Sequence, residues 1–194
     1  MNHFFAYLAR MRYIKRWGLM RSAIPENDAE HTMQTAAIAH ALALIRKEIF
    51  GKDCDPDHAA VLALYHDASE VFTGDMPTPV KYFDDTLRDA YGKIETMARQ
   101  ELLETLPKEL RETYRPYVVT PEEDALWPLA KAADTLSAYL KCVEEEAAGN
   151  GEFRAAAQTI EKKLREKDMP EINWFLNHFA GSFRLTLDEM KAEK

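Results

Sequence analysis

Residues 27–50, with the sequence NDAEHTMQTAAIAHALALIRKEIF, decide the fold class of this chain. Asn27 and Glu30 have the spacing of a capping box, in which two side chains bind backbone N–H groups at the start of a helix. The run that follows continues from residue 32 to residue 50 without Gly or Pro. The stretch therefore predicts a long helix over 28–50.

Similar start and stop signals recur on both sides of this stretch. Asp55-Pro56 predicts an N-cap followed by proline at the first helical position, opening a helix that runs to about Phe72. Thr120-Pro121 predicts another helix to about residue 148, ended by Gly149 and the residues after it. Further helices are predicted over 3–15, 84–106, 152–167, 170–180 and 187–193. The β-like stretch 117–120 is too short to matter, so we expect one all-α domain over 1–194, a helical bundle.

The composition is that of an ordinary globular domain. At 194 residues, with 46% hydrophobic and 30% charged residues, the chain has the length of one domain. Its longest apolar run, AAIAHALALI, is shorter than the ~18 residues that a membrane span needs. The N-terminal segment does not have the features of a signal peptide. The only two cysteines, Cys54 and Cys142, fit no zinc or redox spacing. We therefore expect a cytoplasmic protein.

The charge of the chain is unevenly distributed. The formal net charge is −8, which argues against a general binder of nucleic-acid polymers or membranes. Residues 1–25 nevertheless contain five Lys or Arg side chains and no acid. Such a patch can attract a small anion, or it can be the solvated basic face of a first helix. The triple acid at 144–146 is expected to be a solvated helix face.

A second stretch, LYHDASEVFTGDMP at 64–77, carries the candidate chemistry. Each residue of a helix turns the side chain by about 100°. His66, Asp67 and Glu70 would therefore project within one arc of about 100°. Ionisable groups are costly to bury unless they are paired or bind a metal. A divalent cation would explain the pair His66 and Asp67, because imidazole nitrogen and carboxylate oxygen are common ligands.

Two residues on other predicted helices complete a candidate ligand set. His31 lies in the first turn of the helix over 28–50, and Ile38 and Leu42 indicate that its face of the helix points inward. Asp134 lies among Ala and Leu in PLAKAADTLSAYL, where a carboxylate is unexpected. A lone helical His is more often a packed or surface residue, so His31 gains its weight from the set of four.

The order His31, His66-Asp67, Asp134 resembles the H…HD…D pattern of the HD-domain metal-dependent phosphohydrolases, which are all-α proteins with a metal held between helices. The sequence around each position makes the likeness specific: AEHTMQTA, ALYHDASEVFTGDMPTPVKY and KAADTLSAYLKCVEEEAAGN closely resemble the bacterial YfbR-like 5′-deoxynucleotidases of that superfamily. The opening HFFAYLARMRYIKRWGLMR is also similar to theirs. The resemblance extends over essentially the whole chain.

This resemblance implies an enzyme that hydrolyses deoxyribonucleoside 5′-monophosphates to the deoxynucleoside and phosphate. It implies broad acceptance of bases, selectivity against ribonucleotides, and a homodimer. The implied metal ligands are His31, His66, Asp67 and Asp134. The implied catalytic residues are Glu70, as general acid or base, and Arg16. The implied substrate-contacting residues are Arg16, Trp17, His31, Asp67, Asp75, Met76, Pro77, Thr78 and Asp134. The mixed N/O ligand set suits Co²⁺ or Mn²⁺.

Each implied role has chemistry behind it and an ordinary alternative. A guanidinium such as Arg16 matches a phosphate through two parallel hydrogen bonds. The indole of Trp17 would form a wall against the sugar that disfavours a 2′-hydroxyl, or it would simply anchor the first helix in the core. Glu70 would act on the attacking water or the leaving 5′-oxygen, or it would be an exposed carboxylate at a helix end. Pro77 directs the loop after the helix across the site, and Asp75 would accept a hydrogen bond from the 3′-hydroxyl or cap the turn.

Three alternatives to a 5′-deoxynucleotidase stay open. The first is another HD phosphohydrolase, acting on cyclic nucleotides, alarmones or nucleoside triphosphates. The second is a non-catalytic HD module that senses nucleotides, although such a sensor would not need both Glu70 and Arg16. The third is a purely structural helical protein, which would have no reason to place acids on three inward faces.

Overall fold

The structure, a computed structural model, describes residues 1–81 and 83–192 and is helical throughout, as predicted. Within these residues the β-structure is a single antiparallel bridge between Lys15 and Asn27. In chain order the elements are α1 (Phe4–Leu8), η1 (Ala9–Tyr13), α2 (Asp28–Leu44), η2 (Ile45–Ile49), α3 (Pro56–Leu64), α4 (Glu70–Thr73), α5 (Thr78–Lys81), α6 (Asp85–Glu104), α7 (Lys108–Val118), η3 (Pro121–Glu123), α8 (Trp127–Ala147), η4 (Gly151–Phe153), α9 (Arg154–Arg165), α10 (Pro170–His178), η5 (Ala180–Arg184) and α11 (Leu187–Ala192). The η elements are 3-10 turns, except η2, which is one turn of π-helix.

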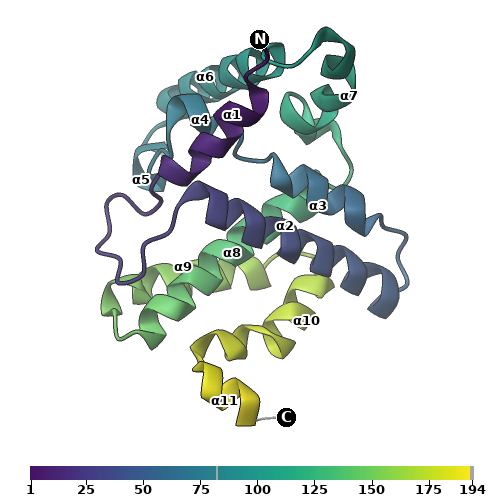
Figure 1. Ribbon diagram of the computed structural model, residues 1–194. Helices are drawn as coiled ribbons and strands as arrows, with labels where there is room; N and C mark the ends of the chain where they lie inside the picture. Colours follow the sequence, from purple (N-terminus) through teal and green to yellow (C-terminus); the bar gives the residue numbers. More distant parts are fainter. Residues whose placement is uncertain (82, 193–194) are drawn as a thin grey trace.

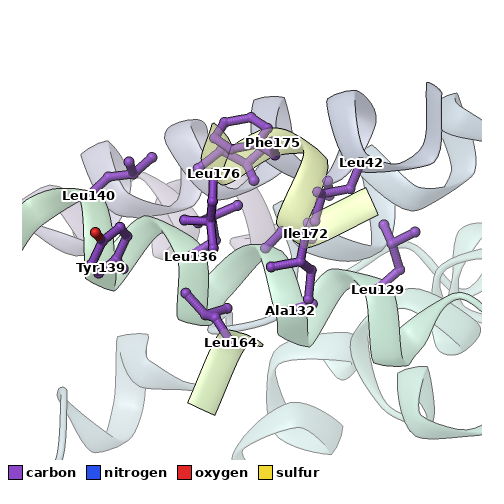
Figure 2. Close-up of a cluster of buried hydrophobic side chains, with 14 of the residues drawn as sticks. Leu42, Leu129, Ala132, Leu136, Tyr139, Leu140, Leu164, Ile172, Phe175 and Leu176 are labelled. Atoms are coloured by element: carbon purple, nitrogen blue, oxygen red, sulfur yellow. The ribbon is translucent and has the colours of Figure 1, made fainter. Parts of the chain in front are cut away.

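Helices α2, α3 and α8 lie together at the centre of the molecule, with α9 and α10 beside them and the α6–α7 pair above, next to α1 (Figure 1). Leu136 and Leu140 of α8 have no exposed surface and pack with Leu42 of α2 in the main hydrophobic core (Figure 2). Leu164 of α9 and Ile172 of α10 close the same core (Figure 2). A second, smaller core under α1 contains Phe4, Leu102, Leu103, Leu106, Ala68 and Val118. No helix in the described ranges is long and apolar enough to cross a membrane.

The two clearest helix signals of the sequence are confirmed. Asn27 Oδ1 accepts hydrogen bonds from the backbone of Ala29 and Glu30, and Glu30 Oε2 accepts one from the Asn27 N–H, which completes the capping box. Gly149 follows the end of α8 with φ = 84°, a left-handed conformation that glycine adopts without steric cost. These ends set the positions of α2 and α8, which carry two of the candidate metal ligands.

The predicted continuous helix from Asp55 to about Phe72 is wrong. Helix α3 ends at Leu64, a tight turn occupies 65–69, and a new helical turn, α4, begins at Glu70. In an unbroken α-helix the carbonyl of Ala63 would accept the N–H of Asp67. Here it accepts a hydrogen bond from Nδ1 of the His66 ring at 2.7 Å and a longer one from the His66 backbone N–H at 3.4 Å. The His66 side chain thus takes the acceptor that a continued helix would need.

Smaller corrections concern helix limits. The helix expected from Thr120 begins as a short 3-10 turn, and α8 itself starts only at Trp127. The first predicted helix, 3–15, divides into α1 and η1. Helix α7 was not predicted at all, and its last two residues are the first half of the stretch taken as β-like. The final predicted helix ends at Ala192, and its expected last residue, 193, lies outside the described residues.

Candidate active site

Four side chains from three parts of the chain meet between α2, α3 and α8. His31 comes from the first turn of α2, His66 and Asp67 from the turn between α3 and α4, and Asp134 from α8. One potential ligand atom from each lies within 4.8 Å of all the others. His31 Nε2 is 3.1 Å from Asp134 Oδ1, and His66 Nε2 is 2.9 Å from Asp67 Oδ2. The residues that the H…HD…D pattern selects therefore occupy one place in the structure.

Both histidines are oriented by a hydrogen bond on the ring nitrogen that faces away from the cluster. His66 Nδ1 donates to the carbonyl of Ala63 at 2.7 Å. His31 Nδ1 lies 3.2 Å from Ser137 Oγ, whose own proton goes to Gln34 Oε1 at 2.7 Å. Ser137 therefore accepts from His31. With both protons on Nδ1, each Nε2 presents a lone pair to the cluster, as a metal-ligating histidine requires.

The donor set fits a divalent cation. His66 is 3% exposed, and among the described residues its Nε2 makes no hydrogen bond, although it faces Asp67 Oδ2 at 2.9 Å. An unpaired buried nitrogen is costly, and a cation held by two imidazoles and two carboxylates would remove that cost. Two neutral nitrogens with two carboxylate oxygens form a mixed N/O site of the kind that Zn²⁺, Mn²⁺ or Co²⁺ occupies. Lys131, one turn before Asp134, forms an ion pair with Asp134 Oδ2.

Arg16 reaches the same place from the segment between η1 and α2. Its Nη1 atom lies 3.5 Å from Asp67 Oδ2 and 3.5 Å from Asp28 Oδ1, and its Nε atom lies 3.3 Å from Glu26 Oε2. The side chain is 13% exposed, so it is nearly withdrawn from solvent yet still accessible from one side. This places a guanidinium directly beside a candidate metal ligand, as an enzyme that binds a phosphate on the metal would need.

Glu70 lies behind the cluster and faces a second buried carboxylate, Asp28. Burial, together with the charges of Asp67 and Asp28, raises the pKa of Glu70 to about 11. Burial also raises the pKa of Asp28, to about 6. The two groups can therefore share a proton at neutral pH. A bound divalent cation would lower both pKa values, because it stabilises the ionised carboxylates. Glu70 is not the exposed helix-end carboxylate that the alternative interpretation required.

Sequence analysis overlooked three residues of the site: Asp28, Ser137 and Lys131. Asp28 is fully buried, and its carboxylate faces Glu70 and the guanidinium of Arg16. A signal for Asp28 was present, because it precedes His31 by three positions and thus shares its face of the helix. Ser137 stands three positions after Asp134 in the same way. Lys131 precedes Asp134 by three positions, so the same spacing on α8 was a signal for it as well.

The remaining predicted substrate residues are Trp17 and the segment from Asp75 to Thr78, and of that segment Asp75 is within electrostatic reach of Arg16, Asp67 and His31. Trp17 packs edge-to-face on Phe153, with 5.2 Å between ring centroids, and its indole N–H donates to Glu26 Oε2 at 2.8 Å. These contacts match the anchoring alternative, and a contact with the sugar stays a prediction. Asp75 follows Gly74, whose φ is 70°, and burial raises the pKa of Asp75, with Arg16 acting against that rise. Asp75, Met76 and Pro77 are half-buried, and Thr78 is exposed at the start of α5.

With this geometry established, comparison with known proteins identifies the family. The model of the YfbR-like 5′-deoxynucleotidase family matches residues 3–183. The chain belongs to this family. A 5′-deoxynucleotidase of Vibrio vulnificus is 52% identical over 192 residues, which cover 97% of this chain and 98% of the relative. A 5′-deoxynucleotidase of Erwinia tasmaniensis is 47% identical over 193 residues, covering 99% and 98%.

Solved structures of other HD phosphohydrolases share the fold. One from Listeria innocua superposes with a TM-score of 0.77 at 22% identity, covering 97% of this chain and 92% of that one. The cyanophage S-2L HD phosphohydrolase DatZ, solved with dA and one catalytic Zn²⁺ ion, superposes with a TM-score of 0.59 at 22% identity, covering 91% and 96%. These likenesses confirm the predicted all-α HD-type architecture.

Proposed function

We propose that this protein is a metal-dependent 5′-deoxynucleotidase that converts deoxyribonucleoside 5′-monophosphates to deoxynucleosides and phosphate. The observation that carries the proposal is the convergence of His31, His66, Asp67 and Asp134 within 4.8 Å, with Arg16 beside the cluster. Membership of the YfbR-like family supports the choice of substrate. A purely structural role would not explain why two imidazole nitrogens and two carboxylates meet at one buried point.

The proposed metal ligands are the same four residues. A divalent cation bound there would supply the chemistry of lowering the pKa of a bound water and polarising a phosphoryl oxygen. His31 and His66 are already held by hydrogen bonds at Nδ1, so their Nε2 atoms need no reorientation to bind it. We propose Co²⁺ or Mn²⁺ as the ion. DatZ, with its Zn²⁺, supports a divalent cation in this fold without selecting among these metals.

The proposed phosphate ligand is Arg16. In the structure its guanidinium is shared among the carboxylates of Glu26, Asp28 and Asp67. A phosphate brings two negative charges and three acceptor oxygens, so it competes with these partners for the same N–H groups. Arg16 would thereby hold the substrate and balance the charge that develops on the phosphoryl oxygens during hydrolysis.

Glu70 is the proposed general acid. Burial, together with the charges of Asp67 and Asp28, raises its pKa above the ordinary value, which favours a carboxyl group that carries a proton. Hydrolysis needs a proton on the leaving 5′-oxygen, and a buried carboxylic acid next to the cluster can deliver it. After transfer, the carboxylate of Glu70 can take a proton back from water. Arg16 and Glu70 together distinguish this site from a module that only senses nucleotides.

Selectivity for the deoxy sugar is proposed to come from Trp17, whose indole would form an apolar wall where a ribonucleotide carries its 2′-hydroxyl. An apolar wall discriminates against an added hydroxyl only modestly, by roughly a hundredfold. Asp75 would accept a hydrogen bond from the 3′-hydroxyl, and the segment Met76, Pro77 and Thr78 would border the sugar. We propose broad acceptance of bases, a homodimer, and a cytoplasmic enzyme. Cys54 and Cys142 are both free thiols, which is compatible with a reducing compartment.

One assay tests the proposal: phosphate release from a panel of 5′-deoxynucleotides and ribonucleotides, with and without Co²⁺ or Mn²⁺, beside Glu70→Gln. We expect metal-dependent release from the deoxynucleotides, lost in Glu70→Gln while metal binding is retained. Equal rates on ribonucleotides would remove the selectivity claim. Hydrolysis confined to triphosphates, alarmones or cyclic nucleotides would assign the protein to another branch of the HD phosphohydrolases. Absence of turnover on all of these substrates would favour the sensor.

Asp75 has a test of its own in the same assay. In Asp75→Ala we expect KM for a deoxynucleoside monophosphate to rise, because the 3′-hydroxyl loses its acceptor. A substrate lacking the 3′-hydroxyl should be used equally well by both proteins. An unchanged KM for the ordinary substrate would show that Asp75 has only a local structural role.

A further inference from the structure

Lys141 and Glu145 form a buried ion pair on α8, outside the catalytic cluster. Their side chains are 3% and 0% exposed, and Lys141 Nζ lies 2.5 Å from Glu145 Oε1. Glu145 was expected on a solvated face, and that prediction is wrong. A buried ion pair contributes little net stability compared with apolar residues of similar size, and breaking it is costly. The pair is therefore better explained by what it contacts than by its own attraction.

The pair directs its hydrogen-bonding groups to one short segment. Glu145 Oε2 accepts from the backbone N–H of Ala23 at 2.8 Å, and Glu145 Oε1 accepts from that of Ile24 at 2.9 Å. The ammonium of Lys141 donates to the carbonyl of Ile24. Asn150, just after α8, donates to Glu145 Oε2 at 2.7 Å. Side chains at the end of α8 thus bind two backbone N–H groups and one carbonyl of a segment that has no regular secondary structure.

A second set of contacts holds the neighbouring residue of that segment. Asn150 Nδ2 donates to the carbonyl of Arg21 at 2.7 Å, and the carboxylate of Glu152 accepts from the Arg21 backbone N–H at 3.1 Å and from its side chain. Residues 21–24 are therefore docked on the junction between α8 and η4. In Figure 1 the segment runs down from η1 towards this junction before it returns to α2.

The other end of the same segment carries Arg16. Lys15 and Asn27 form the antiparallel bridge, and the backbone N–H of Arg16 donates to the carbonyl of Glu26 at 3.1 Å. We call residues 15–27 the arginine loop. It is closed at its base by this bridge and docked at its tip by the pair on α8. Arg16 lies at the base, next to the bridge, and its backbone is continuous with the docked tip.

The residue next to Arg16 shows that this path is imposed on the loop. Trp17 has φ = 59°, a conformation that residues with side chains rarely adopt and that persists only when surrounding contacts impose it. Its indole is held by Glu26 and by the ring of Phe153, and Lys141 Nζ lies 5.8 Å from the centroid of the same ring. The contacts that constrain Trp17 and those that dock the tip thus meet at Lys141.

We propose that the buried Lys141–Glu145 pair is a positioning device for Arg16, which it sets by docking residues 21–24 of the arginine loop on α8. The role of Arg16 as phosphate ligand rests on the proposed function. Among the described residues, the hydrogen bonds and ion pair of Lys141 and Glu145 reach the loop and Asn150 rather than a metal ligand. A merely structural pair would stabilise the fold without affecting the affinity for phosphate.

The test compares Glu145→Gln with a matched control, Glu166→Gln, which breaks an exposed Lys-Glu pair of the same spacing on α9 and its C-cap. Three quantities are measured on the metal-loaded protein. They are hydrogen exchange of the amides in 15–27, the Kd for inorganic phosphate by calorimetry, and kcat and KM for a deoxynucleoside monophosphate. The kinetics are repeated in an Arg16→Ala background. Asn150→Ala serves as a milder second variant should Glu145→Gln not fold.

We expect Glu145→Gln to accelerate exchange in the loop and to weaken phosphate binding and kcat/KM by about tenfold or more, since small misplacements of a binding group have effects of this size. In the Arg16→Ala background the same change should cause no further loss, because both changes remove one interaction. Metal affinity should be unchanged, and Glu166→Gln should behave as the unmodified protein does.

Two results would overturn the proposal. One is a Glu145→Gln protein whose loop exchanges faster while its affinity for phosphate is unchanged. The other is a loss of kcat/KM on Glu145→Gln that is as large in the Arg16→Ala background as in the unmodified protein. If the unmodified protein hydrolyses no monophosphate, the proposed function fails. The exchange and phosphate-binding measurements still decide whether the pair positions Arg16.

Discussion

Ser137→Ala provides a sharp test of how the metal site is built. Ser137 Oγ lies 3.2 Å from His31 Nδ1, and its hydroxyl donates a hydrogen bond to Gln34 Oε1 at 2.7 Å. Removal of the hydroxyl leaves the Nδ1–H of a fully buried histidine without an acceptor. An unsatisfied buried polar group costs about 1–3 kcal/mol of folding free energy. Loss of a hydrogen bond that orients a ligating histidine lowers metal affinity by roughly 10- to 100-fold.

We therefore expect Ser137→Ala to reduce the affinity for Mn²⁺ or Co²⁺ by about 10- to 100-fold, which corresponds to about 1.4–2.7 kcal/mol of binding free energy. Calorimetric titration measures the affinity, and urea unfolding of the metal-free protein measures stability. Thr32→Val is the matched control, because the buried Thr32 hydroxyl has no hydrogen-bond partner among the described residues, so its removal leaves no group unsatisfied. Metal affinity equal to that of the unmodified protein in Ser137→Ala would refute the claim that this hydrogen bond orients His31.

Three further predictions concern individual charged groups. Glu70→Gln should lower kcat by about 10²- to 10⁴-fold with metal affinity retained, since a general acid contributes about that much; a normal kcat would exclude Glu70 as the acid. Arg16→Lys should lower kcat/KM about tenfold or more, because an ammonium cannot make two parallel hydrogen bonds to phosphate; kinetics unaffected by the change would place the phosphate elsewhere. Hydrogen bonds from Lys141, Ile24 and other donors outweigh burial and lower the pKa of Glu145 from 4.5 to about 2. Its stabilising contribution, of order 3 kcal/mol, is therefore complete above about pH 4.5 and disappears as pH falls through about 2. The difference in urea-unfolding free energy between the unmodified protein and Glu145→Gln should narrow over that range; a constant difference would contradict the lowered pKa.

Much of the fold was readable because the relevant signals are local. The capping box at Asn27 and the left-handed Gly149 depend on backbone groups within a few residues. The start of α2 and the end of α8 can therefore be predicted from residues that are close in the sequence. The same holds for the Pro at the start of α3. The four candidate ligands, which the structure brings together, were selected as a group because their residue types are unexpected on apolar helices and because their order resembles a known family.

Other features depended on partners far away in the chain. The turn that ends α3 arises from a competition for the carbonyl of Ala63, which the His66 ring wins. Helical periodicity contains no information about that competition. Glu145 looked like one of three solvated acids, yet it accepts hydrogen bonds from residues more than a hundred positions earlier.

The sequence by itself determined the helical class, the principal helix ends and the identity of the candidate metal ligands, because these rest on interactions between near neighbours and on residue chemistry. Only the tertiary structure decided which nitrogen of each histidine faces the site, that Asp28 lies against Glu70, and that Lys141 and Glu145 hold the loop of Arg16. Hydrogen bonding and burial of these groups depend on distances between separate helices, which packing alone sets.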